Sequence, residues 1–274
     1  YWGPKLAVEA LADHAKRIAV DFVAELDPAQ LNDTLKPLNP HTTLFIVASK
    51  SFTTYETLEN AQRVKAWLNA AGIDDISQHF IAITQDIAKA EAFGILERNC
   101  LPVWDWVGGR YSVWSAMGLS IALCYGMPTF EAFLSGAHRM DQHVKNAEWI
   151  DNIPVLAAAV SHWYSQYFKA PTHAILPYPY RLRSLVPYCQ QLEMESLGKA
   201  VDKQGHWVDY PTGNIVWGST GTQAQHAYNQ LLHQGTHLVP VDFIVSETEK
   251  KLMNQAKAQS QALTDAIGTK GRDF

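Results

Sequence analysis

The sequence has few cysteines, a low share of charged residues and no long apolar run. Only three of its 274 residues are cysteines, Cys100, Cys124 and Cys189, and none of them forms a Cys-x-x-Cys pair. This spacing argues against a disulfide framework or a zinc site and favours a reducing compartment such as the cytoplasm. No stretch approaches the ~18 apolar residues that a membrane-spanning helix requires.

The charge balance is mildly acidic, with 22 Lys and Arg against 27 Asp and Glu. Nucleic acid is therefore not expected as the main partner, because its phosphate backbone calls for a basic protein surface. A small anionic ligand needs only a local site and is compatible with this balance. The chain is 47% hydrophobic and long enough for one large or two ordinary domains. No secretion signal is visible, but the chain begins without Met, so this says little about location.

Helical and strand patterns alternate along the chain, which predicts an α/β fold with mostly parallel sheets covered by helices on both faces. The expected strands are 18–23, 43–48, 80–84, 101–107, 173–176, 215–217 and 238–245. The expected helices are 4–16, 29–38, 55–71, 87–93, 112–125, 130–146, 154–168, 182–199, 222–233 and 247–266, with a loop at 268–274. A helical stretch without strands near 127–170 divides the pattern, which predicts domains at 1–127 and 128–274.

A hydroxyl-rich loop follows a compact apolar strand in the segment TLFIVASKSFTTYETLENA. The loop places these groups between the strand and the next helix: Ser49, Lys50, Ser51, Thr53 and Thr54. Ligands of open α/β sheets bind at the carboxyl ends of strands, and helix N-termini attract anions. We therefore predict a phosphate-monoester site here, without the glycine pattern of a nucleotide P-loop. Helix capping is the alternative: Thr53 or Thr54 could cap the next helix, and Thr53 and Glu56 also have the spacing of a capping box.

A second loop, within VGGRYSVWSAMG (107–118), carries Arg110 after a pair of glycines. Gly108 and Gly109 would let the backbone approach a ligand closely, and Arg110 could then meet an oxyanion. A tight turn with a surface arginine explains the same residues. The sequence alone leaves both interpretations open.

A third segment, GSTGTQAQHAYNQLLHQGTH (218–237), places His226 early in a predicted helix after a glycine-rich turn. His226 is a candidate base or hydrogen-bond donor. His233 and His237 follow at spacings of seven and four, but Gly235 should end the helix between them. We therefore expect no three-histidine metal site, and we interpret His233 and His237 as structural polar groups.

The segment YCQQLEMESLGKAV places Glu193 and Glu195 two residues apart in a predicted helix. Successive helical residues point about 100° apart, so at most one of the two carboxylates faces a given pocket. The apolar neighbours Leu192, Met194 and Leu197 predict a partly desolvated surrounding.

Together, four segments resemble the phosphoglucose isomerase family. They are SKSFTTYET, GGRYSVWSAMGL, QQLEMESLGK and GTQAQHAYNQLLHQGT. They resemble the family patterns S-K-T-F-T-T-x-E-T, G-G-R-[YF]-S-x-W-S, Q-Q-x-x-M-E-S-N-G-K and G-T-N-G-Q-H-[SA]-[FY]-x-Q-L-[IL]-H-Q-G-T. The segments occur in the family's order and span residues 49–236, which is far more specific than any one motif alone.

The resemblance implies a homodimer of chains with two sugar-isomerase-type (SIS) three-layer αβα domains. It implies interconversion of glucose 6-phosphate and fructose 6-phosphate through an enediolate, as in glycolysis and gluconeogenesis, without metal or cofactor. It implies that the phosphate is held by Ser49, Lys50, Ser51 and Thr54. Glu195 would be the base, Arg110 would stabilise the enediolate, and His226 would enter the site from the partner subunit to assist ring opening. The implied supporting residues are Glu56, Gln191 and Gly109.

The chain departs from the family patterns at several positions. Ser51 replaces Thr, Leu197 replaces Asn, residues 218–220 replace G-E-P and residues 223–224 replace N-G. The family's G-I-G-G-S loop and its C-terminal helix with a catalytic lysine have no match. We therefore expect an internal piece of the enzyme that is weakly active or inactive alone. A non-catalytic sugar-phosphate sensor is the alternative function, because it would need the phosphate loop but no positioned base.

Overall fold

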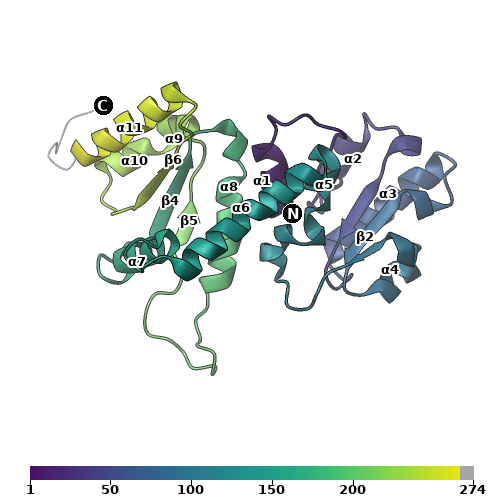
Figure 1. Cartoon of the computed structure of the whole chain (residues 1–274), viewed down its shortest axis with the longest axis horizontal. Helices are drawn as coiled ribbons and strands as arrows, with labels where there is room; N and C mark the ends of the chain where they lie inside the picture. The colour runs from purple at the N-terminus through teal and green to yellow at the C-terminus, as the bar shows by residue number, and fades with distance from the viewer. Residues whose placement is uncertain (266–274) are drawn as a thin grey trace. The chain divides into compact units, whose positions relative to one another are not determined.

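The computed structural model describes residues 1–265, which form two compact units, each built on a three-stranded parallel sheet (Figure 1). The first unit contains residues 14–131, Tyr1 and residues 3–5. The second unit contains Trp2, residues 6–13 and the chain from residue 132 onward. The boundary falls within helix α6 (Met127–Asn146). The predicted loop 268–274 lies outside the described residues.

The sheet of the first unit has the order β1 (Phe45–Ala48), β2 (Phe80–Thr84) and β3 (Cys100–Pro102), all parallel. Phe45 pairs with Phe80 in the register. Alternate strand residues point to opposite faces. Each face therefore carries its own hydrophobic cluster, and the sheet lies between two helical layers.

The larger cluster of the first unit packs α2 (Pro28–Leu35), α3 (Tyr55–Ala70) and α4 (Ile87–Phe93) on one face of the sheet. Helix α2 begins with Pro28 after Asp27, whose side chain accepts from the Ala29 amide at 2.9 Å, a typical N-cap. Residues before and within α5 (Leu119–Tyr125) pack against the other face.

The sheet of the second unit has the order β5 (Ile215–Trp217), β4 (Thr172–Pro177) and β6 (Val241–Ile244), again parallel. Helix α8 (Leu185–Gln190) covers one face, while α9 (Gly221–Ala227) and α11 (Lys250–Asp265) cover the other, as Figure 1 shows. The neighbours Ile175 and Leu176 on β4 point into these two separate clusters.

Further helices and short turns complete the described chain. The remaining α-helices are α1 (Trp2–Ala10), α7 (Ile153–Gln166) and α10 (Asn229–Gln234). The short helical turns are η1 (Pro40–Thr42), η2 (Ile76–Gln78), η3 (Glu97–Asn99), η4 (Gly109–Trp114), η5 (Ala116–Gly118), η6 (Tyr180–Leu182) and the π-helical turn η7 (Gln191–Glu195).

The prediction of mixed α/β structure with parallel sheets is confirmed, and the strand 80–84 and the helix 87–93 have the predicted bounds. The strand predicted at 18–23 is wrong, because the segment has no strand beside it in the described chain. Just after it, the amides of Ala24 and Glu25 donate instead to Oε1 of Gln30, each at 3.0 Å. The strand predicted at 101–107 ends at Pro102, since the chain turns from Trp104 to Val107.

Three predicted helices are shorter or interrupted. The segment 112–125 contains two short 3-10 turns before α5, separated by the extended backbone of Ser115. The segment 222–233 is divided into α9 and α10 at Tyr228, whose φ of −145° is not helical. The segment 182–199 changes to a π turn at Gln191. Side-chain periodicity alone does not show such backbone breaks.

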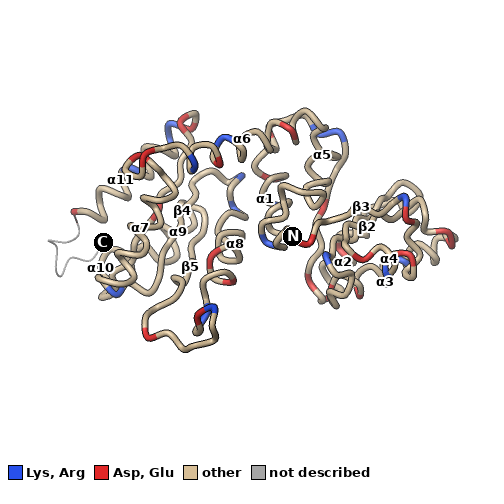
Figure 2. The backbone as a smooth tube through the Cα atoms, turned by 60° about the horizontal axis from the view of Figure 1, so that its bottom comes forward, with Lys and Arg blue, Asp and Glu red and all other residues tan. Residues whose placement is uncertain are grey.

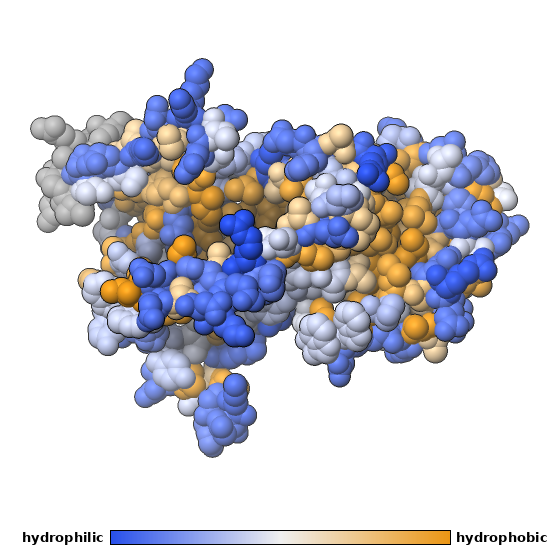
Figure 3. All heavy atoms as spheres, in the orientation of Figure 1, coloured by the Kyte–Doolittle hydropathy of each residue, from blue (hydrophilic) through white to orange (hydrophobic). Residues whose placement is uncertain are grey.

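Acidic and basic positions are mixed along both units (Figure 2). Apolar residues also reach the surface (Figure 3). Helix α7 has no buried residue. Ile153 and Trp163 on this helix are 63% and 53% exposed. Among residues 1–265, no helix is long and apolar enough to cross a bilayer.

Candidate functional site

The predicted phosphate loop lies at the carboxyl end of β1, in the first unit. The amide of Ser49 donates to the carbonyl of Ile83 at 3.1 Å, which extends the β1–β2 ladder by one residue. Ser49 is buried, and its Oγ lies 3.0 Å from Oγ1 of Thr54. Ser51 Oγ lies 2.6 Å from Oγ1 of Thr53. The loop therefore folds so that its four hydroxyls form two adjacent pairs.

The capping-box alternative is wrong for this loop. Thr54, not Thr53, is the N-cap of α3, and its side chain makes no capping hydrogen bond. Its hydroxyl turns back to Ser49 instead. The N-terminus of this 16-residue helix attracts negative charge through its exposed N–H groups and its dipole. Hydroxyls beside it can therefore bind an anion, and Glu56 lies in the same first turn, exposed.

Phe52 gives the loop its tight curvature. Its φ of 49° lies in the left-handed region, which costs a non-glycine residue ~1–2 kcal/mol. Its side chain is only 3% exposed and meets Phe93 edge-on at 6.0 Å between ring centroids. The amide of Phe52 donates to the carbonyl of Ser49 at 3.1 Å. Burial of the ring thus stabilises a backbone turn that would otherwise be unfavourable.

The side chain of Lys50 crosses to a second loop. Its Nζ donates to the carbonyls of Asp105 at 2.6 Å and Val107 at 2.9 Å. Neither partner is charged, and in the described part of the chain no carboxylate oxygen lies within ion-pair distance of Nζ. By contrast, Lys89 Nζ is paired with Asp86 at 2.8 Å. Lys50 therefore keeps an uncompensated positive charge beside the hydroxyl loop.

The loop that Lys50 contacts leads directly into Gly109 and Arg110. Residue 109 begins η4, and a Cβ placed on it would meet no atom within 4 Å. The backbone is thus open to close approach at this point, although neither Gly108 nor Gly109 has a positive φ. Arg110 is half-buried, with its guanidinium carbon 5.3 Å from the ring centroid of Tyr111. The first unit thus brings the predicted phosphate loop and the loop before Arg110 together.

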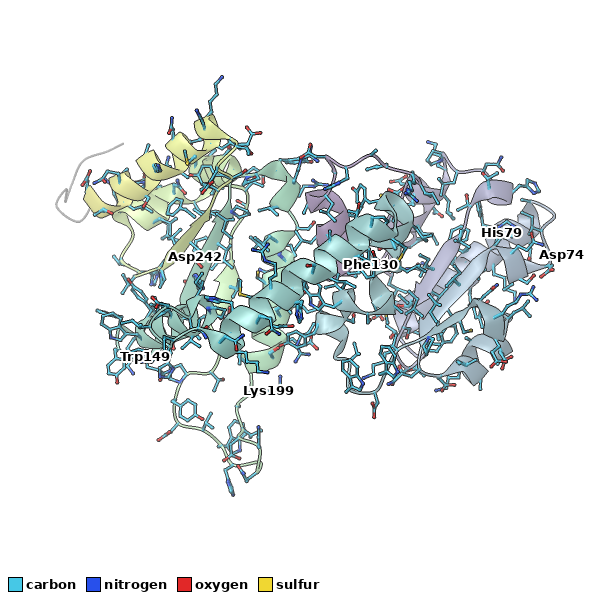
Figure 4. All side chains as sticks on the ribbon, in the orientation of Figure 1. Asp74, His79, Phe130, Trp149, Lys199 and Asp242 are labelled. Atoms are coloured by element: carbon cyan, nitrogen blue, oxygen red, sulfur yellow. The ribbon has the colours of Figure 1, made fainter. Side chains whose placement is uncertain are left out.

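Glu195 and Gln191 lie at the two ends of the π turn η7 in the second unit. Gln190, just before the turn, donates through Nε2 to the carbonyl of Val216 on β5 at 2.9 Å. Lys199, labelled in Figure 4, donates through Nζ to the carbonyl of Glu195. The turn is therefore anchored on both sides. A π turn inside an α-helix is uncommon and is frequent at functional sites.

The predicted apolar surrounding of Glu195 is wrong. Glu195 and Gln191 are exposed, and Met194 and Leu197 are 38% and 54% exposed. The physical reason is that α8 packs on the sheet through Val186, which turns these residues away from the core.

A charged cluster that the sequence did not reveal lies beside this turn. His173 on β4 has its Nε2 2.9 Å from Oδ2 of Asp242 on β6, labelled in Figure 4. The hydrogen bond to Asp242 raises the pKa of His173 against partial burial, and the negative charges of Asp242 and Glu193 add to the effect. Burial, with Glu193 and Asp242, also raises the pKa of Cys189 to about 11. Glu193 is half-buried, whereas Glu195 is exposed.

His226 lies on α9, the helix after β5. It is exposed and occupies the last turn of α9, not the first turns of a longer helix, because the backbone breaks at Tyr228. Tyr228 OH lies 2.8 Å from Ser219 Oγ, which ties the break to the turn after β5. Within the second unit His226 therefore belongs to a different element from Glu195 and Gln191.

Fold and loop geometry define a mixed α/β protein with parallel sheets, the first of which is followed at β1 by a hydroxyl-rich loop. Comparison with known proteins identifies the family, because the phosphoglucose isomerase family model matches residues 1–270. The chain belongs to the phosphoglucose isomerase family.

Curated relatives agree with this assignment. The chain is 48% identical over 274 residues to glucose-6-phosphate isomerase of Shewanella baltica strain OS185. It is 45% identical over 270 residues to that of Christiangramia forsetii. These matches cover 96% and 95% of this chain but 50% of each relative, so the chain spans about half their length.

Solved structures also match. A crystal structure of glucose-6-phosphate isomerase from Chlamydia trachomatis superimposes with a TM-score of 0.86 at 30% identity, covering 96% of this chain and 53% of that one. A hypothetical protein from Thermus thermophilus gives a TM-score of 0.81 at 27% identity, covering 97% and 67%.

Proposed function

We propose that the protein catalyses the reversible isomerisation of glucose 6-phosphate and fructose 6-phosphate, on two SIS-type domains. Family membership supports the reaction class, and the name of its relatives supplies the substrate. The observation that carries the proposal is the hydroxyl loop, whose Ser49 and Thr54 side chains pair with each other instead of capping α3. Such a loop beside an uncompensated lysine suits a doubly charged phosphate monoester.

The proposed phosphate site consists of Ser49, Lys50, Ser51 and Thr54. Holding the phosphate away from the reacting carbons supplies binding energy that orients the sugar. Glu195 then takes the proton from C2 while the C1 carbonyl becomes the enediolate oxygen, and returns the proton to C1. Arg110 stabilises the negative charge that develops in this step.

His226 would assist ring opening, with Glu56 as its companion, and Gly109 and Gln191 would support the site. We propose a homodimer in which His226 reaches the partner's site. A cytoplasmic location is supported by three cysteines that are all free.

Deuterium exchange tests the assignment of the base. Glucose 6-phosphate is incubated in D2O with the wild-type chain, Glu195→Gln or Glu193→Gln, and label at C2 is measured by NMR. This assay detects even slow turnover. We expect Glu195→Gln to abolish exchange and to leave substrate binding nearly intact. Glu193→Gln is the matched control two residues away, and it should retain exchange.

The same measurement separates an isomerase from a non-catalytic sensor of sugar phosphates. A sensor would bind glucose 6-phosphate, and label would not enter C2 with any variant. Equal loss of exchange and binding in Glu195→Gln would contradict the role of Glu195 as the base.

A further inference from the structure

We propose that Lys50 is a positioning residue that couples the phosphate loop to the loop before Arg110. The proposal deepens the proposed function and rests on it for the identity of the anion. The ammonium of Lys50 donates to the carbonyls of residues 105 and 107. The Lys50 side chain therefore connects the loop after β1 to the loop after β3 at one edge of the sheet. An anion bound at residues 49–54 would then also order residues 103–110.

The main chain of Lys50 is held independently of its side chain. Its carbonyl accepts from the Gln85 amide at 2.8 Å and from Thr84 Oγ1 at 3.1 Å. Thr84 is fully buried at the end of β2. The backbone of residue 50 is therefore fixed at the end of the sheet. Groups that bind its side chain, such as the carbonyls of residues 105 and 107, are held relative to the sheet in turn.

The receiving loop contains a rigid part and an exposed part. Val103 and Val107 are 3% and 7% exposed and pack against Ile83 beneath the loop. Between them, Trp104 and Trp106 are 59% and 76% exposed and stack on each other with centroids 5.7 Å apart. The exposed turn at 104–106 buries little apolar surface. The two hydrogen bonds from Lys50 should therefore contribute much of what holds this turn in one conformation.

The geometry also leaves Lys50 able to contact the anion. An ammonium group has three N–H donors, and carbonyls accept two of them here. The third donor and the uncompensated charge remain for an anion. Bonds from a charged donor are roughly twice as strong as neutral ones. Binding of an anion to the same group that holds residues 105 and 107 links the two loops.

Hydrogen exchange tests the coupling in the ligand-free chain first. In Lys50→Met we expect the amides of residues 103–111 to exchange about tenfold faster or more, with β2 unchanged. Lys50→Arg restores the donors and should recover most of this protection. Lys89→Met is the matched control, since Lys89 approaches the carbonyl of Ser51 at 3.4 Å but pairs with Asp86. Unchanged exchange at 103–111 in Lys50→Met would overturn the proposal.

Adding inorganic phosphate tests the transmission. In the wild-type chain we expect phosphate to slow exchange at both 49–56 and 103–111, and in Lys50→Met at 49–56 only. A merely structural lysine would leave the second loop responsive in the variant, which would overturn the coupling. Absence of any phosphate effect in the wild type would overturn the phosphate site instead, while the ligand-free comparison still decides whether Lys50 holds the loop. If Lys50→Met does not fold, Lys50→Arg takes its place in the comparison, with Lys89→Met as the control. Faster exchange at 103–111 in folded Lys50→Arg than in Lys89→Met would then overturn the proposal.

Discussion

Nε2 of His173 lies 2.9 Å from Oδ2 of Asp242, and this pair joins two neighbouring parallel strands. The hydrogen bond raises the pKa of His173 in the folded state, and the negative charge of Glu193 acts in the same direction. A group whose pKa is higher when folded stabilises the fold fully below its unfolded pKa of ~6.5. That contribution is lost as pH rises through the folded pKa.

We therefore expect the free energy of unfolding to fall as pH rises above ~6.5, and Asp242→Asn to reduce this dependence. Urea denaturation between pH 5 and pH 9 (roughly the range in which histidine titrates) measures it. Asp202→Asn is the control, because its pair with His206, at 3.3 Å, is exposed on the surface. If both variants change the pH dependence of the free energy of unfolding equally, the His173–Asp242 pair does not cause that dependence.

The sequence predicts what depends on neighbouring residues. The position of the candidate phosphate loop could be predicted from a cluster of hydroxyl residues after an apolar strand, because strand, loop and helix follow one another within a few residues. Contacts between distant residues were not predictable. Lys50 contacts Asp105 and Val107, which lie 55 and 57 positions further along the chain. His173 contacts Asp242, which lies on a different strand.

The π turn η7 shows why a local pattern can suggest the wrong backbone. The letters of Gln191–Glu195 fit an ordinary helix, and nothing in their spacing indicates the wider turn. The bond from Gln190 to the carbonyl of Val216 is a tertiary contact that fixes this part of the helix against β5. Tertiary anchoring of this kind overrides helical periodicity.

Substitution of Gly218 should destabilise the second unit strongly. Its φ is 145°, and a Cβ there would lie 2.0 Å from the carbonyl oxygen of Ile175 on the central strand. The backbone must shift to relieve this contact, so we expect Gly218→Ala to lower the free energy of unfolding by ~1–3 kcal/mol or more. Gly136→Ala is the opposite control: residue 136 lies exposed in α6 with open space around its Cβ. Ala there should stabilise by ~0.5–1 kcal/mol, so equal losses in denaturation of the two variants would contradict this reasoning.

Cys189 should react slowly with thiol reagents. The thiolate is the reactive form, and burial together with Glu193 and Asp242 raises the pKa of this thiol to about 11. At pH 8, only about one thiol in a thousand would be ionised at that pKa. We expect Cys189 to be labelled by iodoacetamide far more slowly in the native chain than in urea, as followed by peptide mass spectrometry. Fast native labelling would show that α8 separates readily from the sheet.

Replacement of Phe52 separates the strain of its backbone from the burial of its ring. Phe52→Ala leaves a cavity beside Phe93 and keeps a side chain at φ 49°, so we expect a loss of ~3–5 kcal/mol in the free energy of unfolding. Phe52→Gly leaves the same cavity, but glycine adopts this φ without the Cβ penalty. The glycine variant should therefore be more stable than the alanine variant by about 1 kcal/mol, despite its larger loss of chain entropy. Parallel urea denaturation of both variants measures the difference, and a more stable alanine variant would mean that the left-handed turn stores no strain.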